Sequence, residues 1–358
     1  MIQRIGVLTS GGDCPGLNAV LRGVVRAAAN RGWEVLGFHD GFEGLLSPAS
    51  YEVLDTRRCA GIMHLGGTIL GTTNRGHFVA KVGEGALAEV PAEIIAQAKA
   101  TIEELGLGAL ICIGGDGSLA TALQFHVAGV PCIGVPKTID NDLEATAISF
   151  GFDSAVACVA DALDRLHTTA SSHKRVMVLE VMGRHAGWIA LYGGLAGGAD
   201  IILIPEILFS YEAVAEAVRK RATEGCTSTM VVVAEGAHPK DRGELYRKSG
   251  PGEYKLGGMG EQVAAEIAAR TEKETRCCVL GHLQRGGPPT TLDRILGTRF
   301  GVYAVDLIAE GRFGEMVSYQ NYQVLGVPIS HAVHRTKRVQ SDGQVVATAR
   351  AVGISFGD

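Results

Sequence analysis

Residues 5–30 read IGVLTSGGDCPGLNAVLRGVVRAAAN. The apolar run 5–9 predicts a strand, residues 10–16 form a glycine-rich turn, and residues 17–30 have the apolar spacing of a helix. Residues 34–38 then predict a second strand. Strand, turn, helix and strand in this order are typical of a parallel sheet that is covered by helices.

The same alternation of apolar runs and helical patterns continues to about residue 240. It predicts further strands at 109–113, 130–135, 175–181, 200–204 and 228–234. A chain of 358 residues exceeds one ordinary domain. We therefore predict an α/β protein with two similar three-layer Rossmann-like lobes, each with a mostly parallel sheet, and an active site in the cleft between them.

The predicted lobes are discontinuous in sequence. The first comprises residues 1–151 plus about 286–335, and the second comprises residues 152–285. The polar stretch 239–260 suggests a surface excursion. The pattern weakens beyond about residue 330, so residues 336–358 are predicted only as a tail of uncertain packing.

Composition limits the classes of function. Hydrophobic residues make up 46% of the chain and charged residues 20%, which suits a globular enzyme and argues against disorder. No stretch is long and apolar enough to cross a bilayer, and residues 1–4 lead directly into the first strand without an export signal. We therefore expect a cytoplasmic protein with no membrane partner. The net charge of −5 gives no general attraction to nucleic acid, so anion binding has to come from local clusters of basic side chains and backbone amides.

The eight cysteines show no paired metal-ligand spacing. Cys112 and Cys132 lie in apolar strand-like runs, where buried free thiols are expected. Cys277 and Cys278 are adjacent, which disfavours an ordinary disulfide between them. Reduced thiols agree with a cytoplasmic location.

Two Gly-Gly-Asp turns follow predicted strands. SGGDCPG at 10–16 and GGDGS at 114–118 each lie between a strand and a helix, where the unpaired amides of the first helical turn favour an anion. Taken alone, the first turn could equally be a tight structural turn. In the second, Asp116 could hold Mg²⁺ or cap the helix that follows, while Gly117 and Ser118 present donors to phosphates.

The densest charge follows the predicted strand 130–135, in the sequence PKTIDND at 136–142. Asp140 and Asp142 lie two positions apart, close to Lys137. A general base for a hydroxyl proton has to be an ionised carboxylate held at the reacting oxygen, and this motif offers two. An Asx turn with two solvated acids is the alternative.

Basic groups accumulate in the second half of the chain. Arg184, in MGRHAGW, follows an apolar strand, where it could neutralise charge on a transferring phosphoryl group or form a surface salt bridge. Arg276 precedes the segment GHLQRGG, which contains His282 and Arg285. Arginine and histidine suit a phosphomonoester, and a carboxylate at a strand end, such as that of Glu235, suits sugar hydroxyls.

These segments, in this order, resemble the 6-phosphofructokinase family. The resemblance runs from the first strand to about Arg294, and PKTIDND and GHLQRGG carry it far more specifically than either glycine turn. It implies that the chain uses ATP and Mg²⁺ to phosphorylate the 1-hydroxyl of fructose 6-phosphate, giving fructose 1,6-bisphosphate and ADP in glycolysis. The roles of the motifs agree with what phosphoryl transfer requires, which is mainly alignment and charge neutralisation.

The resemblance also implies a role for each residue. Asp140 would be the general base, with Asp142 supporting it or facing the metal, and Asp116 would bind Mg²⁺. The transferring phosphoryl group would be stabilised by Thr138, Arg184 and the Gly11 amide. The donor would be bound by Gly11, Arg75, Gly115, Asp116, Gly117 and Ser118. Fructose 6-phosphate would be bound by Thr138, Ile139, Asp140, Arg175, Met182, Gly183, Arg184, Glu235, Arg276, His282, Leu283, Gln284 and Arg285.

An oligomer and an effector site follow from the same resemblance. Arg175 and Arg276 would reach the 6-phosphate in a neighbouring subunit, which implies a homo-oligomer, either a dimer or a tetramer. Arg22, Arg26 and Arg58 match positions that bind phosphorylated allosteric effectors in bacterial relatives. Arg22 and Arg26, spaced by four on one predicted helix, could equally form a solvated face.

Two residues give opposing indications of the donor. Pyrophosphate users of the family typically carry an aspartate at the place of Gly117, and that carboxylate would crowd and repel the α-phosphate of a nucleotide. Lys137 occupies a position where familiar bacterial ATP users have glycine and pyrophosphate users have lysine. The combination resembles the family's mixed branch, whose Gly-plus-Lys members are mostly ATP-dependent. We give Gly117 more weight and predict ATP, with a pyrophosphate-dependent phosphotransferase as the alternative.

Other readings explain less of the sequence. Arg75, in GTTNR, stands one place later than the family's donor-binding arginine, and Phe42 stands where a tyrosine near the adenine is common. A kinase for NAD or a lipid also carries Gly-Gly-Asp-Gly but leaves the basic cluster around His282 unexplained. A non-catalytic sugar-phosphate sensor would be expected to lose the residues assigned to the base, the metal and the phosphoryl charge, and all of these are present.

Overall fold

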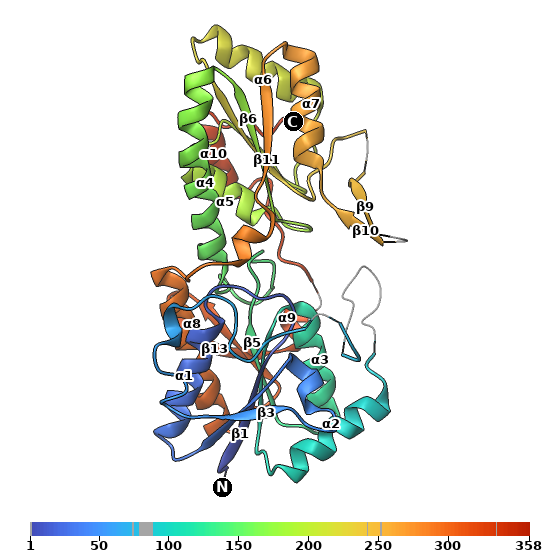
Figure 1. The fold of residues 1–358 in the computed structure, drawn as a ribbon, viewed down its shortest axis with the longest axis vertical. Helices are drawn as coiled ribbons and strands as arrows, with labels where there is room; N and C mark the ends of the chain where they lie inside the picture. The colour runs from blue at the N-terminus through green and yellow to red at the C-terminus, as the bar shows by residue number, and fades with distance from the viewer. Residues whose placement is uncertain (1, 74, 79–88, 242, 251–252, 334) are drawn as a thin grey trace. The chain divides into compact units, whose positions relative to one another are not determined.

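The computed structural model describes residues 2–73, 75–78, 89–241, 243–250, 253–333 and 335–358. Asn74 of GTTNR and parts of the polar stretch 239–260 lie outside them. The chain forms two compact units, each with a sheet and helices (Figure 1). Unit 1 consists of Met1–Ile139, Leu143–Ser154 and Arg285–Thr336, and unit 2 of Asp140–Asp142, Ala155–Gln284 and Lys337–Asp358.

Unit 1 is built on a seven-stranded sheet in the order β13-β12-β5-β4-β1-β2-β3. The strands are β1 (Arg4–Thr9), β2 (Glu34–Phe38), β3 (Tyr51–Leu54), β4 (Leu110–Gly114), β5 (Cys132–Pro136), β12 (Glu315–Gln320) and β13 (Gln323–Pro328). The strands from β12 to β2 pair in parallel, and β3 and β13 add antiparallel edges. Parallel central strands are covered on both faces, which explains why β4 and β5 are buried throughout.

Helices cover both faces of this sheet. They are α1 (Leu17–Ala29), α2 (Ala92–Glu104), α3 (Asp116–Val127), α8 (Thr291–Ala309) and α9 (Ser330–Val333), with short 3-10 helices η1 (Gly41–Leu45) and η2 (Ile62–His64). In Figure 1, α1 and α8 lie on one side of the strands and α2 and α3 on the other. The rings of Phe42, Phe78 and Phe125 meet with centroids 5.4–5.8 Å apart in the core beneath α3.

Unit 2 has a four-stranded parallel sheet in the order β11-β6-β8-β7. The strands are β6 (Val176–Val181), β7 (Ile201–Leu203), β8 (Thr229–Ala234) and β11 (Thr275–Val279), and β9 (Tyr246–Gly250) and β10 (Glu253–Leu256) form a separate hairpin. The helices are α4 (Phe152–His173), α5 (Trp188–Ala196), α6 (Tyr211–Thr223), α7 (Met259–Thr271) and α10 (Gln344–Ala351), with the 3-10 helix η3 (Gly281–Arg285). Helix α4 begins in unit 1 and continues in unit 2.

The C-terminal residues are part of unit 2. Ser355 pairs with the start of β7, where its carbonyl accepts from the Ile202 amide and its amide donates to the Asp200 carbonyl. Val346 of α10 and Phe356 are buried. The segment that the sequence left as a tail therefore completes the second core.

The predicted fold class is confirmed: the protein is α/β, with two mostly parallel sheets and helices around each. The predicted strands all occur, with ends shifted by one or two residues. All eight cysteines are free thiols, as expected. Of the helices described here, none has the length and apolar character needed to cross a membrane.

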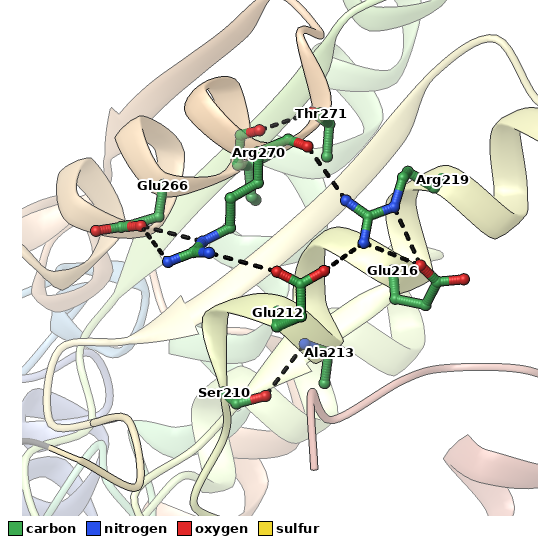
Figure 2. Close-up of polar contacts among 9 residues, drawn as sticks. Ser210, Glu212, Ala213, Glu216, Arg219, Glu266, Arg270 and Thr271 are labelled. Atoms are coloured by element: carbon green, nitrogen blue, oxygen red, sulfur yellow. Dashed lines mark hydrogen bonds and ion pairs between the residues drawn. The ribbon is translucent and has the colours of Figure 1, made fainter.

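Helices α6 and α7 carry a network of charges on their exposed sides (Figure 2). Arg219 pairs with Glu212 and Glu216 and donates to the Arg270 carbonyl at 3.1 Å. Arg270 in turn pairs with Glu212 at 3.3 Å and with Glu266 at 3.0 Å. The network ties the two helices together, but its members are exposed, so each pair contributes little to stability.

Candidate functional site

In unit 1, the predicted donor-binding turns lie together at the carboxyl ends of three neighbouring strands, β1, β4 and β5. The Ser10 amide donates to the Ile113 carbonyl at 2.9 Å, and the Lys137 amide donates to the Gly114 carbonyl at 2.9 Å. Parallel strands bring their carboxyl ends to one edge of the sheet, and this edge is where ligands bind in open α/β folds. The three motifs that the sequence singled out in the first half of the chain are therefore spatial neighbours.

Gly11 follows β1 at this edge, and its backbone conformation favours glycine. Its φ is +82°, a left-handed conformation that residues with a Cβ rarely adopt. A Cβ there would lie 3.4 Å from Ser118 Oγ and 3.6 Å from Lys137 Nζ. The backbone of the first turn, the Ser118 hydroxyl and the Lys137 ammonium group therefore converge on one small region, which is suited to an anion.

Asp116 is the first residue of α3, and the N-cap position belongs to Gly115. No side chain caps this helix, so the alternative in which Asp116 is the cap is wrong. The Asp116 side chain is exposed at the strand end. Magnesium is commonly held by one or two carboxylates together with substrate phosphates and water, and a single exposed carboxylate beside unpaired helix amides fits that arrangement. Within the described ranges, no three or more His, Cys, Asp or Glu side chains form a group that could hold a metal by themselves.

Two arginines lie beside the first glycine turn. Arg75 is exposed, and its amide donates to Thr73 Oγ1, while the Thr73 carbonyl accepts from the Gly11 amide at 3.1 Å. Arg285 Nη1 donates to the Asp13 carbonyl at 3.1 Å and would lie 2.5 Å from a Cβ at position 12. Arg285, which the resemblance assigned to the sugar phosphate, thus belongs to unit 1 and contacts the donor turn.

Unit 2 gathers a second group at the carboxyl ends of β6, β8 and β11. The Glu235 amide donates to the Val181 carbonyl at 2.9 Å, and the amide of Met182 donates to Gln284 Oε1 at 3.3 Å. The group consists of Met182, Gly183, Arg184, Glu235, His282, Leu283 and Gln284. These are seven of the residues that the resemblance assigned to the phosphorylated sugar, with Gln284 buried and Arg184, His282 and Leu283 exposed.

The loop that carries Arg184 is tightly built. Gly183 has a φ of +134°, and a Cβ at Gly236 would lie 2.0 Å from the Arg184 carbonyl oxygen, so neither position tolerates a side chain without movement. At the far end of the loop, Glu206 accepts from the Gly187 amide at 3.0 Å. Burial raises the pKa of the Glu206 carboxyl. These contacts fix the backbone on both sides of the Arg184 side chain.

Arg175 and Arg276 lie at the opposite end of the same sheet. Arg175 directly precedes β6, and Arg276 is the second residue of β11. Both pair with Glu274, Arg175 Nε at 2.8 Å and Arg276 Nη2 at 2.7 Å, and these neighbours lower the pKa of that carboxyl. Within one chain, the structure does not bring these two arginines to Arg184 or Glu235.

The sequence PKTIDND is divided between the units. Lys137, Thr138 and Ile139 belong to unit 1, and Asp140, Asn141 and Asp142 to unit 2. The Ser149 hydroxyl donates to the Thr138 carbonyl at 2.8 Å. Asn141 is buried and has a left-handed φ of +51°. The turn with the predicted base thus has a specific backbone shape, and its two acids, Asp140 and Asp142, are partly buried.

Sequence reasoning missed the partner of this turn, which is Lys337. Its amide donates to the Asp142 carbonyl at 2.7 Å, and its Nζ donates to Asn141 Oδ1 at 2.9 Å. The segment Arg335-Thr336-Lys337-Arg338 was the available signal, because three basic residues among four after a weak pattern suggest an anionic or polar partner. Nothing in the sequence indicated which segment that partner was.

Two further residues from the sequence analysis have clear surroundings. Phe42 is buried against Phe78 and Phe125, so its side chain belongs to the core. Arg58 donates to Glu52 through Nε at 2.7 Å and Nη2 at 2.9 Å. Arg58 is therefore held by an acidic neighbour.

Comparison with known proteins agrees with the geometry. The family model described as phosphofructokinase matches residues 4–308. The ATP-dependent 6-phosphofructokinase of Chloroflexus aurantiacus is 54% identical over 99% of this chain and 98% of its own length. The chain belongs to the phosphofructokinase family.

Other phosphofructokinase relatives include users of both donors. ATP-dependent 6-phosphofructokinase 1 of Synechocystis is 49% identical over all of this chain and 99% of its own length. A protein of Amycolatopsis methanolica named pyrophosphate–fructose 6-phosphate 1-phosphotransferase is 48% identical over 94% of this chain and 96% of its own length.

Solved phosphofructokinases share the fold. The T-state phosphofructokinase of Pichia pastoris superposes with a TM-score of 0.80 at 33% identity, over 93% of this chain. This chain spans only 38% of the length of that protein. The pyrophosphate-dependent enzyme of Marinobacter aquaeolei gives a TM-score of 0.80 at 24% identity, over 99% of this chain and 88% of its own, which supports the fold alone.

Proposed function

We propose that this protein is an ATP-dependent 6-phosphofructokinase, which transfers the γ-phosphoryl group of ATP to the 1-hydroxyl of fructose 6-phosphate. The relatives of highest identity given above carry this name over nearly their full length. The observation that carries the proposal is the convergence of Gly11, Ser118 and Lys137 at one sheet edge, since a polyphosphate needs such a group of amides, hydroxyls and positive charge.

Asp140 is the proposed general base. It takes the proton from the 1-hydroxyl as the oxygen attacks the γ-phosphorus, and Asp142 supports the same turn. A base of this kind contributes about 10²–10⁴-fold to the rate. The buried Asn141 between the two acids, with its left-handed backbone, supports a fixed position for the Asp140 carboxylate.

Charge on the transferring phosphoryl group is neutralised by Arg184 and Thr138, and by the Gly11 amide once the phosphoryl group replaces the Thr73 carbonyl as its acceptor. Phosphoryl transfer asks the protein mainly to align the reacting oxygens and to balance developing negative charge. The donor itself is held by Gly11, Arg75, Gly115, Asp116, Gly117 and Ser118. Mg²⁺, held by Asp116 and the polyphosphate, would supply further charge neutralisation when bound.

Fructose 6-phosphate is bound by the strand ends of unit 2. Glu235 accepts hydrogen bonds from sugar hydroxyls, and Met182, Gly183, Arg184, His282, Leu283 and Gln284 of unit 2 contact the sugar phosphate. Thr138, Ile139 and Arg285 are further residues proposed to bind it. Arg175 and Arg276 serve a neighbouring subunit of a homo-oligomer. Their place at the opposite end of the β6 sheet, away from Arg184, supports a role in another copy's site. We place the enzyme in the cytoplasm.

A pyrophosphate-dependent enzyme is the second candidate, because Lys137 lies at the proposed phosphate position and a relative with that name is 48% identical. Gly117, the second residue of α3, favours ATP, because the aspartate that pyrophosphate users typically carry there would repel a nucleotide phosphate. Initial rates with fructose 6-phosphate and Mg²⁺, measured with ATP and with pyrophosphate in parallel, test the choice. Formation of fructose 1,6-bisphosphate with ATP is expected, and turnover with pyrophosphate alone would contradict it.

A further inference from the structure

The C-terminal segment holds the turn that carries the proposed base. The Lys337 amide donates to the Asp142 carbonyl at 2.7 Å, and Lys337 Nζ donates to Asn141 Oδ1 at 2.9 Å. Lys337 thus donates hydrogen bonds to the turn from both its backbone and its side chain. Lys337 is half-buried and Asn141 is 5% exposed, so water competes little for the contact between them.

The same segment is anchored on its other side to the start of α5. Trp188 Nε1 donates to the Lys337 carbonyl at 2.8 Å, and Lys337 Nζ lies 5.9 Å from the centre of the Trp188 ring. Two residues on, the Val339 amide donates to Glu206 Oε1 at 2.9 Å, and Glu206 also accepts from the Gly187 amide. Helix α5 directly follows the loop that carries Arg184.

A continuous chain of hydrogen bonds therefore runs within unit 2 from Asn141 through Lys337 to Trp188. It joins the turn of Asp140 to the loop of Arg184, although the three segments are far apart in sequence. A hydrogen bond from an ammonium group is stronger than one between neutral groups, and a buried amide oxygen that loses its donor is costly. Removal of the Lys337 ammonium group would thus take this donor away from Asn141 Oδ1 and loosen the turn.

We propose that Lys337 is a positioning residue for phosphoryl transfer: it braces the Asp140–Asp142 turn against the start of α5, so that the C-terminal segment is part of the active-site scaffold. The proposal rests on the proposed function of Asp140. Small displacements of a reacting group, of about 1 Å, can cost about a hundredfold in rate without loss of binding. The brace therefore acts on kcat more than on the affinity for the sugar phosphate.

The principal test is Lys337→Met in the full chain, which keeps the aliphatic stem and the backbone donor and removes the ammonium group. We expect kcat to fall about tenfold or more, while the Kd for fructose 6-phosphate, measured calorimetrically, changes less than about threefold. Lys337→Arg restores a donor and recovers part of the rate. Lys220→Met, at an exposed position of α6 that pairs only loosely with Glu224 at 4.0 Å, is the matched control and keeps wild-type kcat.

A double-mutant cycle separates the brace from general stability. Asn141→Gly removes the acceptor and tolerates the left-handed φ of this position. If Lys337 acts through Asn141, the double variant is about as slow as the slower single variant. Multiplying losses in kcat, or a Lys337→Met enzyme with wild-type kcat, would overturn the proposal. If Lys337→Met does not fold, Trp188→Phe tests the same series of hydrogen bonds, because it keeps an aromatic ring but loses the donor to Lys337. A lowered kcat supports the brace, and an unchanged kcat contradicts it.

The outcomes also distinguish this inference from the proposed function. Absence of wild-type turnover of fructose 6-phosphate with ATP would remove the function and the brace together. Wild-type turnover that Asp140→Asn abolishes and Lys337→Met leaves unchanged would remove the brace alone.

Discussion

Two polar regions of unit 2 differ in almost every respect. On α6 and α7, Arg219 and Arg270 share three glutamates in an exposed network (Figure 2). Around Lys337, a few hydrogen bonds among half-buried or buried groups join a turn, a tail and the start of a helix. The α6–α7 network contains more charged side chains. The Lys337 region contains the left-handed turn at Asn141 and lies next to the Asp140 turn and the Arg184 loop.

The comparison shows that charge density alone does not locate a site. Exposed ion pairs are screened by solvent and salt, and their side chains lose entropy when they pair, so these pairs contribute little to the stability of the fold. A buried polar group that loses its partner is left as an unsatisfied donor or acceptor, which is costly. We therefore expect function to depend on single buried or strand-end residues, and to be nearly insensitive to the α6–α7 network.

The largest expected effect is that of Asp140→Asn. The amide cannot take the proton of the 1-hydroxyl, so kcat falls by about 10²–10⁴-fold, while fructose 6-phosphate still binds. Steady-state kinetics and calorimetric binding of the sugar phosphate measure the two quantities. A variant with wild-type kcat would place the functional centre outside this turn. It would contradict the expectation that function depends on single buried or strand-end residues.

A smaller effect is expected from Gly117→Asp in the first turn of α3. The new carboxylate repels a nucleotide phosphate, so the KM for ATP rises about tenfold or more, which corresponds to about 1.4 kcal/mol. Gly117→Ala is the control, since it adds bulk without charge. Unchanged KM values for ATP in both variants would contradict the donor assignment.

Asp293 offers a comparison in unit 1, since it is a single buried carboxylate. It accepts from the Ser154 amide at 2.9 Å and the Ser154 hydroxyl at 2.6 Å, and burial raises its pKa to about 6. Because this pKa lies above the value of about 3.9 in an unfolded chain, ionisation costs stability as the pH rises from about 4 to 6.

The Asp293→Asn variant lacks this titration. Between pH 5 and pH 7, the free energy of unfolding of the wild type should fall by about 1 kcal/mol relative to that of the variant. Urea unfolding of both proteins at the two pH values gives this difference. A constant difference across that range would mean that the Asp293 carboxyl does not titrate there.

The smallest effect is expected from Arg219→Ala, which removes the centre of the exposed network. Its contacts are screened by solvent and salt, so kcat stays unchanged and the midpoint of thermal unfolding falls by at most about 2 °C. Thermal unfolding at low and high salt measures the loss, which should vanish at high salt. A large loss of kcat would show that the charge network on α6 and α7 affects catalysis, which would contradict this expectation.

Local patterns predicted the framework of the fold well. An apolar run that ends in a polar turn is a short-range signal, and it identified β1, β4, β5, β6 and β8. Because parallel strands align their carboxyl ends, the same signal also indicated that the turns at Gly11, Gly115 and Lys137 would be neighbours. Gly11 itself was indicated by the family resemblance, and its left-handed backbone, which a side chain would strain, accounts for the glycine.

Other features depend on contacts that no local pattern contains. Lys337 and Asn141 are 196 residues apart, and a weak helical pattern gave no sign of their contact. Asp116 resembled a helix cap because it precedes an apolar stretch, yet the helix begins one residue earlier than that reading requires. Arg285 was grouped with His282 by proximity in sequence, whereas its side chain contacts the first glycine turn.

The central claim is that this protein transfers a phosphoryl group from ATP to fructose 6-phosphate. The most direct measurement is ³¹P NMR of a single reaction that contains the wild-type protein, Mg²⁺, fructose 6-phosphate, ATP and pyrophosphate. We predict that the ATP signals give way to those of ADP and a 1-phosphate ester on the sugar, while the pyrophosphate signal stays constant. Loss of the pyrophosphate signal with ATP intact, or no new phosphate ester at all, would contradict the account.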